Sequence, residues 1–190
     1  MKTKIKTVII MLILFSACPA RAVMWTEGYH QMVAGENYGE SAIFNDVKLD
    51  IFGGDISYVD AFNSTITNWY DGEMCYFNAR DNSIVNIYGG ELSSCLGAGD
   101  NGVINLYHSS LIEGISLHDN AILNLHAYDV IHHTTGGFYS DGWIEGRYIL
   151  DNHHFVIDMV GDSFSHISIV PEPATLLLLG LGTMFVKRRK

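Results

Sequence analysis

Apolar and polar residues alternate in short segments that recur along the middle of the chain. In the segment Ile84–Ile87, an asparagine lies between two apolar residues. Equivalent polar residues follow one another at steps of 18, 18, 19 and 19, at Asp50, Asn68, Asn86, Asn105 and Asn124. A fixed period near 20 residues is typical of a solenoid, in which each repeat forms one coil.

Strands are the expected element of each repeat, because the residues on both sides of the central polar position are mostly apolar and this alternation has a period of two. A second apolar column follows six residues later, at Ile56, Met74, Leu92, Leu111 and Val130. Glycines such as Gly89-Gly90 lie between the two columns and indicate a turn. Eighteen or nineteen residues suit short strands rather than a strand and a helix.

The predicted fold is therefore all-β: a small parallel β-solenoid, or β-helix, of about five 18–19-residue coils over residues 45–135. Residues 23–44 show no clear period, and we expect them to form an N-terminal cap or an irregular lead-in to the first coil. Residues 136–169 contain further strand-like segments, which we expect to close the last coil.

Two outward columns follow from this alternation. The central polar residues can stack as a hydrogen-bonded ladder, an interpretation that we favour over ligand binding. Two residues further along lies an aromatic column, which consists of Phe52, Tyr70, Tyr88, Tyr107 and His126. Stacking of these rings would stabilise the coils, and we favour this role. The alternative is a glycan-binding surface, because rings stack on sugars and amides bond to hydroxyls.

Other polar residues allow weaker hypotheses. Cys75 and Cys95 lie about one repeat apart, so they would form a disulfide between neighbouring coils or remain two small buried thiols. A third column, formed by Asp81, Asp100 and Asp119, favours turns capped by carboxylates over a calcium site. The histidine pairs lack the spacing of zinc ligands, and no catalytic motif occurs. We expect no metal, no cofactor and no enzymatic activity.

Charge is distributed very unevenly along the chain, whose net charge is −10. Between residues 23 and 170 there are 20 acidic residues against only three basic residues, Lys48, Arg80 and Arg147, so this part carries about −17. Nucleic acid is excluded as a partner, because binding it requires many Lys and Arg residues. A polysaccharide lyase is disfavoured for the same shortage of basic residues.

The first 22 residues have the pattern of a secretory signal peptide. Lys2, Lys4 and Lys6 precede an apolar segment, and Ala20-Arg21-Ala22 provides an A-x-A cleavage site. We expect a signal helix and cleavage after Ala22. The alternatives are a retained N-terminal anchor and lipoprotein processing at Cys18.

Residues 170–190 combine three parts in order. Val170, Pro171, Glu172 and Pro173 come first, a Leu- and Gly-rich segment follows, and a basic cluster ends the chain. The basic cluster consists of Lys187, Arg188, Arg189 and Lys190. The apolar segment predicts a short transmembrane helix whose basic end stays in the cytoplasm.

This segment resembles the PEP-CTERM sorting domain of exopolysaccharide-producing Gram-negative bacteria. The resemblance covers about 20 of 190 residues. It implies recognition by exosortase, an integral-membrane cysteine transpeptidase, and processing near Pro171-Glu172-Pro173. It also implies an exported precursor that is anchored in the inner membrane and then delivered to the envelope exterior or the extracellular matrix.

Three functional hypotheses follow, in order of preference. The first is a non-enzymatic protein of the cell surface or biofilm matrix. The second is a module that binds glycan or exopolysaccharide through the aromatic column. The third is a β-helix enzyme that cleaves polysaccharide.

Overall fold

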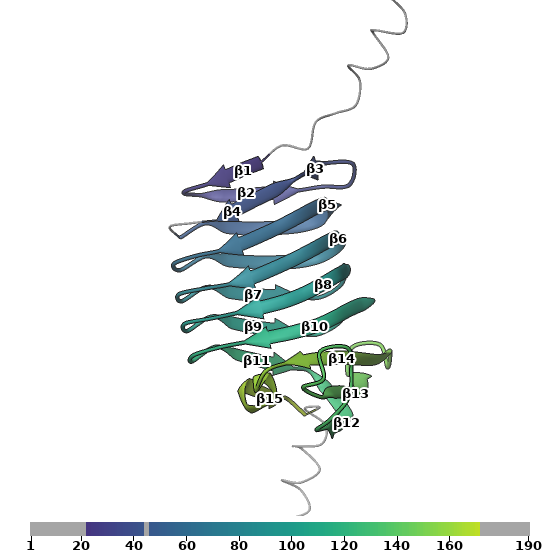
Figure 1. Ribbon diagram of the computed structural model, residues 1–190. Coiled ribbons are helices and arrows are strands. Elements are labelled where there is room, and N and C mark those ends of the chain that lie inside the picture. The colour runs from purple at the N-terminus through teal and green to yellow at the C-terminus, as the bar shows by residue number, and fades with distance from the viewer. Residues whose placement is uncertain (1–21, 44–45, 172–190) are drawn as a thin grey trace, which may run out of the picture.

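The protein is described by a computed structural model that covers residues 22–43 and 46–171 (Figure 1). This part contains 15 β-strands and one short 3-10 helix. Within these two ranges no helix is both long and apolar enough to cross a membrane. The predicted signal helix and the predicted C-terminal transmembrane helix lie outside the described residues.

The strands form a β-solenoid of about five turns, so the predicted all-β fold is confirmed (Figure 1). The long strands β5 (Lys48–Ala61) and β6 (Ile66–Ala79) run through the glycine corner. The next coils have a separate strand on each side of the corner, and these are β7 (Ile84–Ile87), β8 (Glu91–Ala98), β9 (Val103–Leu106) and β10 (Leu111–Leu117). Equivalent strands of neighbouring coils pair in parallel.

The core lies inside the coils, where the predicted apolar positions of successive strands meet. Val85 pairs with Ile104, which pairs in turn with Leu123 of β11 (Ile122–Leu125). All three side chains are fully buried. Met74 and Leu92 are buried on the opposite wall. Each aliphatic side chain buried in this way contributes about 1.5–3 kcal/mol, so stacking supplies the stability that one coil lacks alone.

The second apolar column differs from the prediction at two positions. Ile112, not Leu111, pairs with Leu92 and is buried, while Leu111 pairs with Glu91. The step from Leu92 to Ile112 is 20 residues, because β8 contains one extra residue and the corner before β10 contains another. Val130 does not belong to this column either, because its strand pairs in antiparallel with a later strand and not with the preceding coil.

The predicted cap or lead-in at residues 23–44 contains strands in register with the first coil. It forms β1 (Ala22–Trp25), β2 (Tyr29–Met32), β3 (Asn37–Tyr38) and β4 (Glu40–Ile43). The last three of these strands pair in parallel with β5, and β1 pairs in parallel with β4. Gln31 pairs with Asp50, so it occupies the central polar position of an additional coil.

The C-terminal cap, residues 127–169, replaces the repeat pattern with antiparallel pairing. β12 (Ala127–His133) pairs with β13 (Trp143–Tyr148), which pairs with β14 (His154–Val160). β14 then pairs in parallel with β10, where the second strand of another coil would lie. The repeat pattern therefore ends at Leu125 of β11, earlier than the predicted boundary at residue 135.

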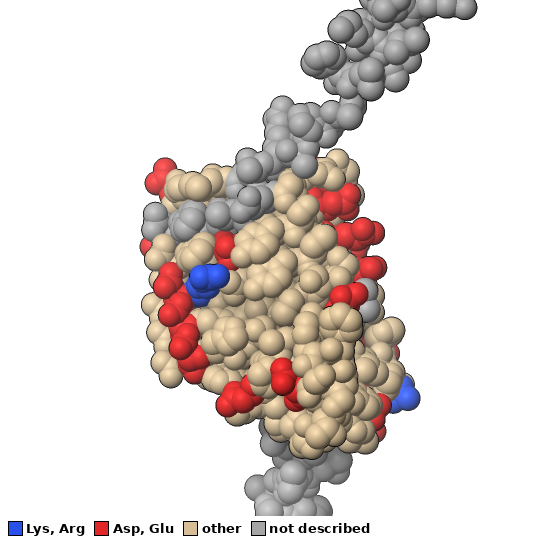
Figure 2. Space-filling model, in the orientation of Figure 1, with Lys and Arg blue, Asp and Glu red and all other residues tan. Residues whose placement is uncertain are grey.

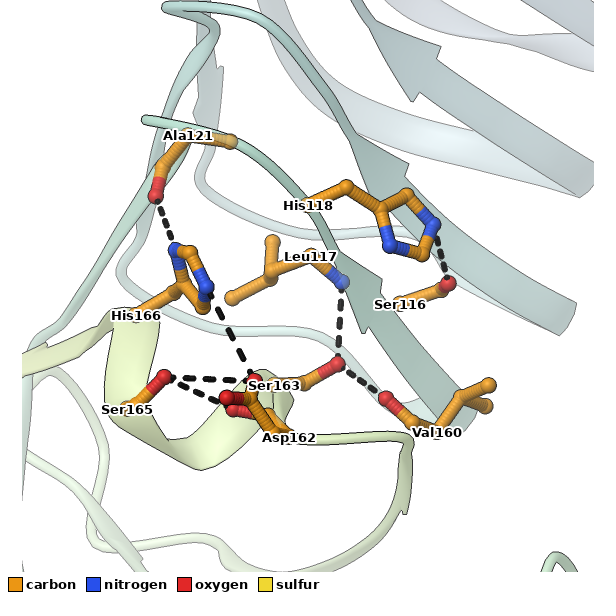
Figure 3. A network of polar contacts seen from close by, with 9 residues as sticks. All are labelled: Ser116, Leu117, His118, Ala121, Val160, Asp162, Ser163, Ser165 and His166. Atoms are coloured by element: carbon orange, nitrogen blue, oxygen red, sulfur yellow. Dashed lines mark hydrogen bonds and ion pairs between the residues drawn. The ribbon is translucent and has the colours of Figure 1, made fainter.

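The 3-10 helix η1 (Ser163–His166) attaches this cap to the last coil (Figure 3). The buried hydroxyl of Ser163 accepts a hydrogen bond from the backbone N–H of Leu117 at 2.9 Å and donates one to the carbonyl of Val160. Nδ1 of His166 lies 3.1 Å from the carbonyl oxygen of Ala121. These contacts position β15 (Ile167–Ile169), which pairs in parallel with β11.

Candidate functional site

The central polar residues form a continuous side-chain ladder, as predicted. Nδ2 of Asn86 donates a hydrogen bond to Oδ1 of Asn68 at 2.8 Å, and Nδ2 of Asn105 donates to Oδ1 of Asn86 at 2.8 Å. Asn124 continues the ladder at the same distance. Each such bond contributes about 0.5–1.5 kcal/mol net. The ladder therefore fixes the register of the coils.

Asp50 is the acceptor at the beginning of this ladder. Its Oδ1 accepts from Nδ2 of Asn68 at 2.7 Å, and its Oδ2 accepts from the hydroxyl of Tyr29 at 2.8 Å. Burial alone would raise the pKa of Asp50, but these two hydrogen bonds and the nearby charge of Lys48 outweigh it and lower the pKa. An ionised carboxylate can only accept, so it orients every amide of the ladder in the same direction.

The aromatic column is also continuous. Ring centroids lie 5.0 Å apart for Phe52 and Tyr70, 5.1 Å for Tyr70 and Tyr88, 4.7 Å for Tyr88 and Tyr107, and 4.0 Å for Tyr107 and His126. The planes of the tyrosine rings are nearly parallel, at 10° and 11°. The rings therefore face one another and turn their edges outward, so a sugar has no room to stack between them.

A groove of about 600 Å³ runs beside this column, between Tyr70 and Tyr88 and a row of carboxylates. The row consists of Asp55, Glu73 and Glu91, which lie in register on adjacent coils. No Lys or Arg is among the described residues that line the groove. The arrangement can accept hydrogen bonds from hydroxyl or amino groups and would repel an anionic ligand.

The corner between the two strands of each coil forms the bottom of the groove. At Gly72, φ is +109°, and a Cβ atom there would lie 2.6 Å from the carbonyl oxygen of Gly54 on the neighbouring coil. Only glycine fits this position, because the coil backbones approach so closely. The groove therefore results from the same glycines that indicated the turn.

The turn aspartates link neighbouring coils through the backbone. Oδ2 of Asp100 accepts the backbone N–H of Asp81 at 3.4 Å, and Oδ2 of Asp119 accepts that of Asp100 at the same distance. The predicted capping role is thus confirmed. The next residue forms a second amide ladder, in which Asn101 donates to Asn82 at 3.2 Å. Among the described residues, no group of three His, Cys, Asp or Glu side chains is placed to hold a metal ion.

Of the two alternatives for Cys75 and Cys95, the disulfide is not formed: both are free thiols, Cys75 exposed and Cys95 only half-buried, so they are not a buried pair either. The cause is a shift in register between β6 and β8. Phe77 pairs with Leu96 whereas Met74 pairs with Leu92, so β8 contains one extra residue in this interval. Cys95 is consequently adjacent to the position of Tyr76 instead of that of Cys75. Burial raises the pKa of the Cys95 thiol.

Two histidines of the cap contact the same glutamate, an arrangement that their spacing in the sequence did not indicate. Nε2 of His133 lies 3.0 Å from Oε1 of Glu145, and Nε2 of His154 lies 3.6 Å from Oε2 of the same residue. Glu145 lies on β13, between the strands that carry the two histidines. The three side chains therefore connect the strands of the cap.

The sorting segment begins where the folded body ends. The backbone N–H of Val170 donates to the carbonyl of Leu125 at 2.9 Å, and exposed Pro171 follows directly. Glu172, Pro173 and the basic residues from Lys187 to Lys190 lie outside the described residues, as does Ala20. The predicted cleavage position Ala22 is the first residue of β1.

Residues 170–190 match the family model of the PEP-CTERM protein-sorting motif. The chain therefore carries a PEP-CTERM sorting motif at its C-terminal end. This motif implies that the protein is exported, that its sorting signal is anchored in a membrane, and that exosortase processes it. A search of curated proteins found no match, and neither did a search of solved structures.

Proposed function

We propose that this PEP-CTERM protein is a non-enzymatic component of the cell surface or extracellular matrix. Its signal peptide directs export, its C-terminal helix holds the precursor in the inner membrane, and exosortase processes it near Pro171-Glu172-Pro173. The motif match at residues 170–190, directly after β15, carries this proposal. The solenoid is then presented outside the membrane as a rigid body.

The polar columns support a structural role for the solenoid. Asn86 uses its amide as both donor and acceptor within the ladder, and the carboxylate of Asp100 accepts a backbone N–H from the preceding coil. The tyrosine rings contact one another in the same way. Polar groups engaged in this manner stabilise the stack of coils, which is what a spacer or matrix element requires.

Fractionation of cells with and without exosortase tests the sorting proposal. We expect intact-mass measurement to show loss of the C-terminal helix and basic cluster only where exosortase is present. In its absence, the full C-terminus should remain in the membrane fraction. The variant Glu172→Ala should behave as if exosortase were missing, whereas the matched variant Glu113→Ala should be processed normally. Identical C-termini in both strains would refute the proposal.

A second candidate function is glycan binding in the groove beside the aromatic column. The observation that favours it is that a row of carboxylates faces Tyr70 and Tyr88 in this groove of about 600 Å³. Ligand hydroxyls would bond to these carboxylates and to the tyrosine hydroxyls, because the ring faces are covered.

The double variant Tyr88→Ser/Tyr107→Ser tests this second function. We expect it to lose saturable retention on exopolysaccharide purified from the producing strain. The matched control is Tyr58→Ser/Tyr76→Ser, which removes an equivalent stacked pair, at 4.8 Å, on the other strand of the coil. If both variants are retained equally on the exopolysaccharide, the groove is not the glycan-binding site. Release of reducing or unsaturated sugar ends would instead favour an enzyme.

A further inference from the structure

The loop between β12 and β13 presents an aromatic side chain to solvent from a well-anchored backbone. The ring of Phe138 is 84% exposed, more than any other large hydrophobic residue whose side chain the structure describes. Tyr139 follows it, with the two ring centroids 5.0 Å apart and the planes at 86°. Val156 is also exposed and lines a cavity together with these two rings, so the three side chains form a group of exposed apolar residues, which points to an interaction.

Several contacts hold this loop in place. The backbone N–H of Phe138 donates to Oδ2 of Asp158, and the N–H of Gly142 donates to the carbonyl of Gly136 at 3.0 Å. The ring of Tyr139 lies over Gly114 of β10, where an added Cβ would come within 2.8 Å of its Cε2 atom. The loop is therefore pre-organised against both β10 and β14, so that its backbone does not need to be ordered by a ligand.

These residues surround a cavity of about 320 Å³. Its walls combine the rings of Phe138 and Tyr139 with Val156 and the carboxylates of Glu113 and Asp158. No Lys or Arg is among the described residues that line it. Unlike the rings of the aromatic column, Phe138 contacts its neighbour edge to face, so a face of its ring remains available to a ligand.

The geometry points to a binding site for an amino sugar with a free, protonated amino group, such as a residue of a partly deacetylated polysaccharide. The apolar face of the sugar ring would lie on Phe138. Its ammonium group would interact with Glu113, Asp158 and the adjacent aromatic rings, which attract cations. Acidic sugars are excluded, because two carboxylates line the cavity and this part of the chain is strongly negative.

This site shares no lining residue with the groove beside the aromatic column, so the two glycan proposals can fail separately. Calorimetric titration of the full-length protein with a fully deacetylated glucosamine pentamer tests the new site. We expect saturable binding of this pentamer and much weaker binding of its N-acetylated form and of cellopentaose. The double variant Tyr88→Ser/Tyr107→Ser should bind the glucosamine pentamer normally.

Two substitutions then test the residues of the cavity. Phe138→Ala and Glu113→Gln should each lower the affinity for the glucosamine pentamer by about tenfold. Both side chains are exposed, so far-UV circular dichroism should show an intact fold. The matched control is Leu150→Ala, which removes another exposed apolar side chain, in the turn between β13 and β14, and should bind normally.

Three results would overturn the inference. One is that the Phe138→Ala variant binds the glucosamine pentamer with unchanged affinity. Another is equal binding of cellopentaose with no effect of Glu113→Gln, since the amino group would then be irrelevant. The third is binding of pentalysine as tight as that of the glucosamine pentamer, which would show a site for amines and not for a sugar.

Discussion

The repeat region and the C-terminal cap hold their strands together in different ways. In the repeat region, each contact recurs on the next coil, as in the bonds from Asn86 to Asn68 and from Asn105 to Asn86. In the cap, each contact occurs once, as where Glu145 meets His133 and His154. A change in the repeat region therefore disturbs two neighbouring coils, whereas a change in the cap affects one local arrangement.

The largest expected effect comes from a charge inside the repeat region. Ile104→Asp would place a carboxylate between Val85 and Leu123 without a cation, at a cost of several kcal/mol. We expect loss of the cooperative unfolding transition in thermal melts followed by circular dichroism. The matched variant Ile122→Asp, whose side chain is 44% exposed on the outside of the coil, should fold. Equal melting temperatures for the two variants would contradict the predicted dry interior.

Glycines give the next largest difference between the two regions. Gly72→Ala should lower the free energy of unfolding by about 1–3 kcal/mol or more, because φ is +109° and the new Cβ would meet Gly54 of the preceding coil. Gly161→Ala in the cap also has positive φ, +63°, but its Cβ would meet no atom within 4 Å. We expect it to cost roughly 1 kcal/mol. Urea denaturation measures both values, and a reversed order would count against close packing of the coils.

The two amide ladders allow a finer comparison within the repeat region. Asn86→Ala removes two bonds of 2.8 Å from half-buried amides and should cost about 1–3 kcal/mol, because its partners lose their hydrogen bonds. Asn101→Ala removes bonds of 3.2 and 3.3 Å at an exposed turn and should cost less than about 1 kcal/mol. Chemical denaturation of both variants gives these values. A smaller cost at Asn86 would mean that the inner ladder does not set the register.

His126 lies where the repeat region meets the cap, and it gives the smallest expected effect. Burial lowers the pKa of His126, so the folded state favours the neutral ring. The ring of His126 in the unfolded state binds a proton as the pH falls below about 6.5, whereas the ring in the folded state does so only at lower pH. The free energy of unfolding therefore decreases with falling pH until the pKa of the folded state is passed. His126→Phe should remove this part of the pH dependence. The melting temperature of the natural protein should therefore fall relative to that of His126→Phe on acidification, and parallel curves would contradict the assignment.

Periodicity in the sequence was sufficient to predict the repeat region. The positions of Asn86 and Asn105 indicated the ladder, and the apolar residues beside them indicated the interior. The additional N-terminal coil escaped prediction because Gln31 is preceded by His30, which breaks the apolar alternation. Ile112 was missed because an extra residue at a corner shifts the phase without changing the pattern on either side.

The candidate sites were less predictable than the fold. The aromatic column was evident from Tyr88 and Tyr107, but only the structure shows that the rings cover one another's faces. The cavity at Phe138 had no periodic signal, because Glu113 and Asp158 come from different elements that the cap brings together. On the face that Figure 2 shows, many of the acidic side chains lie along the left and right margins, which composition alone could not locate.

Engineered disulfides test most directly whether strands one period apart lie side by side. Ile84 pairs with Val103, which pairs with Ile122. In a background with both Cys75 and Cys95 changed to serine, the pair Ile84→Cys/Val103→Cys should oxidise to an intramolecular disulfide, because neighbouring strands lie about 4.8 Å apart. The pair Ile84→Cys/Ile122→Cys spans two coils and should remain reduced. Disulfide formation in the second pair but not in the first would contradict the parallel stack on which the whole account depends.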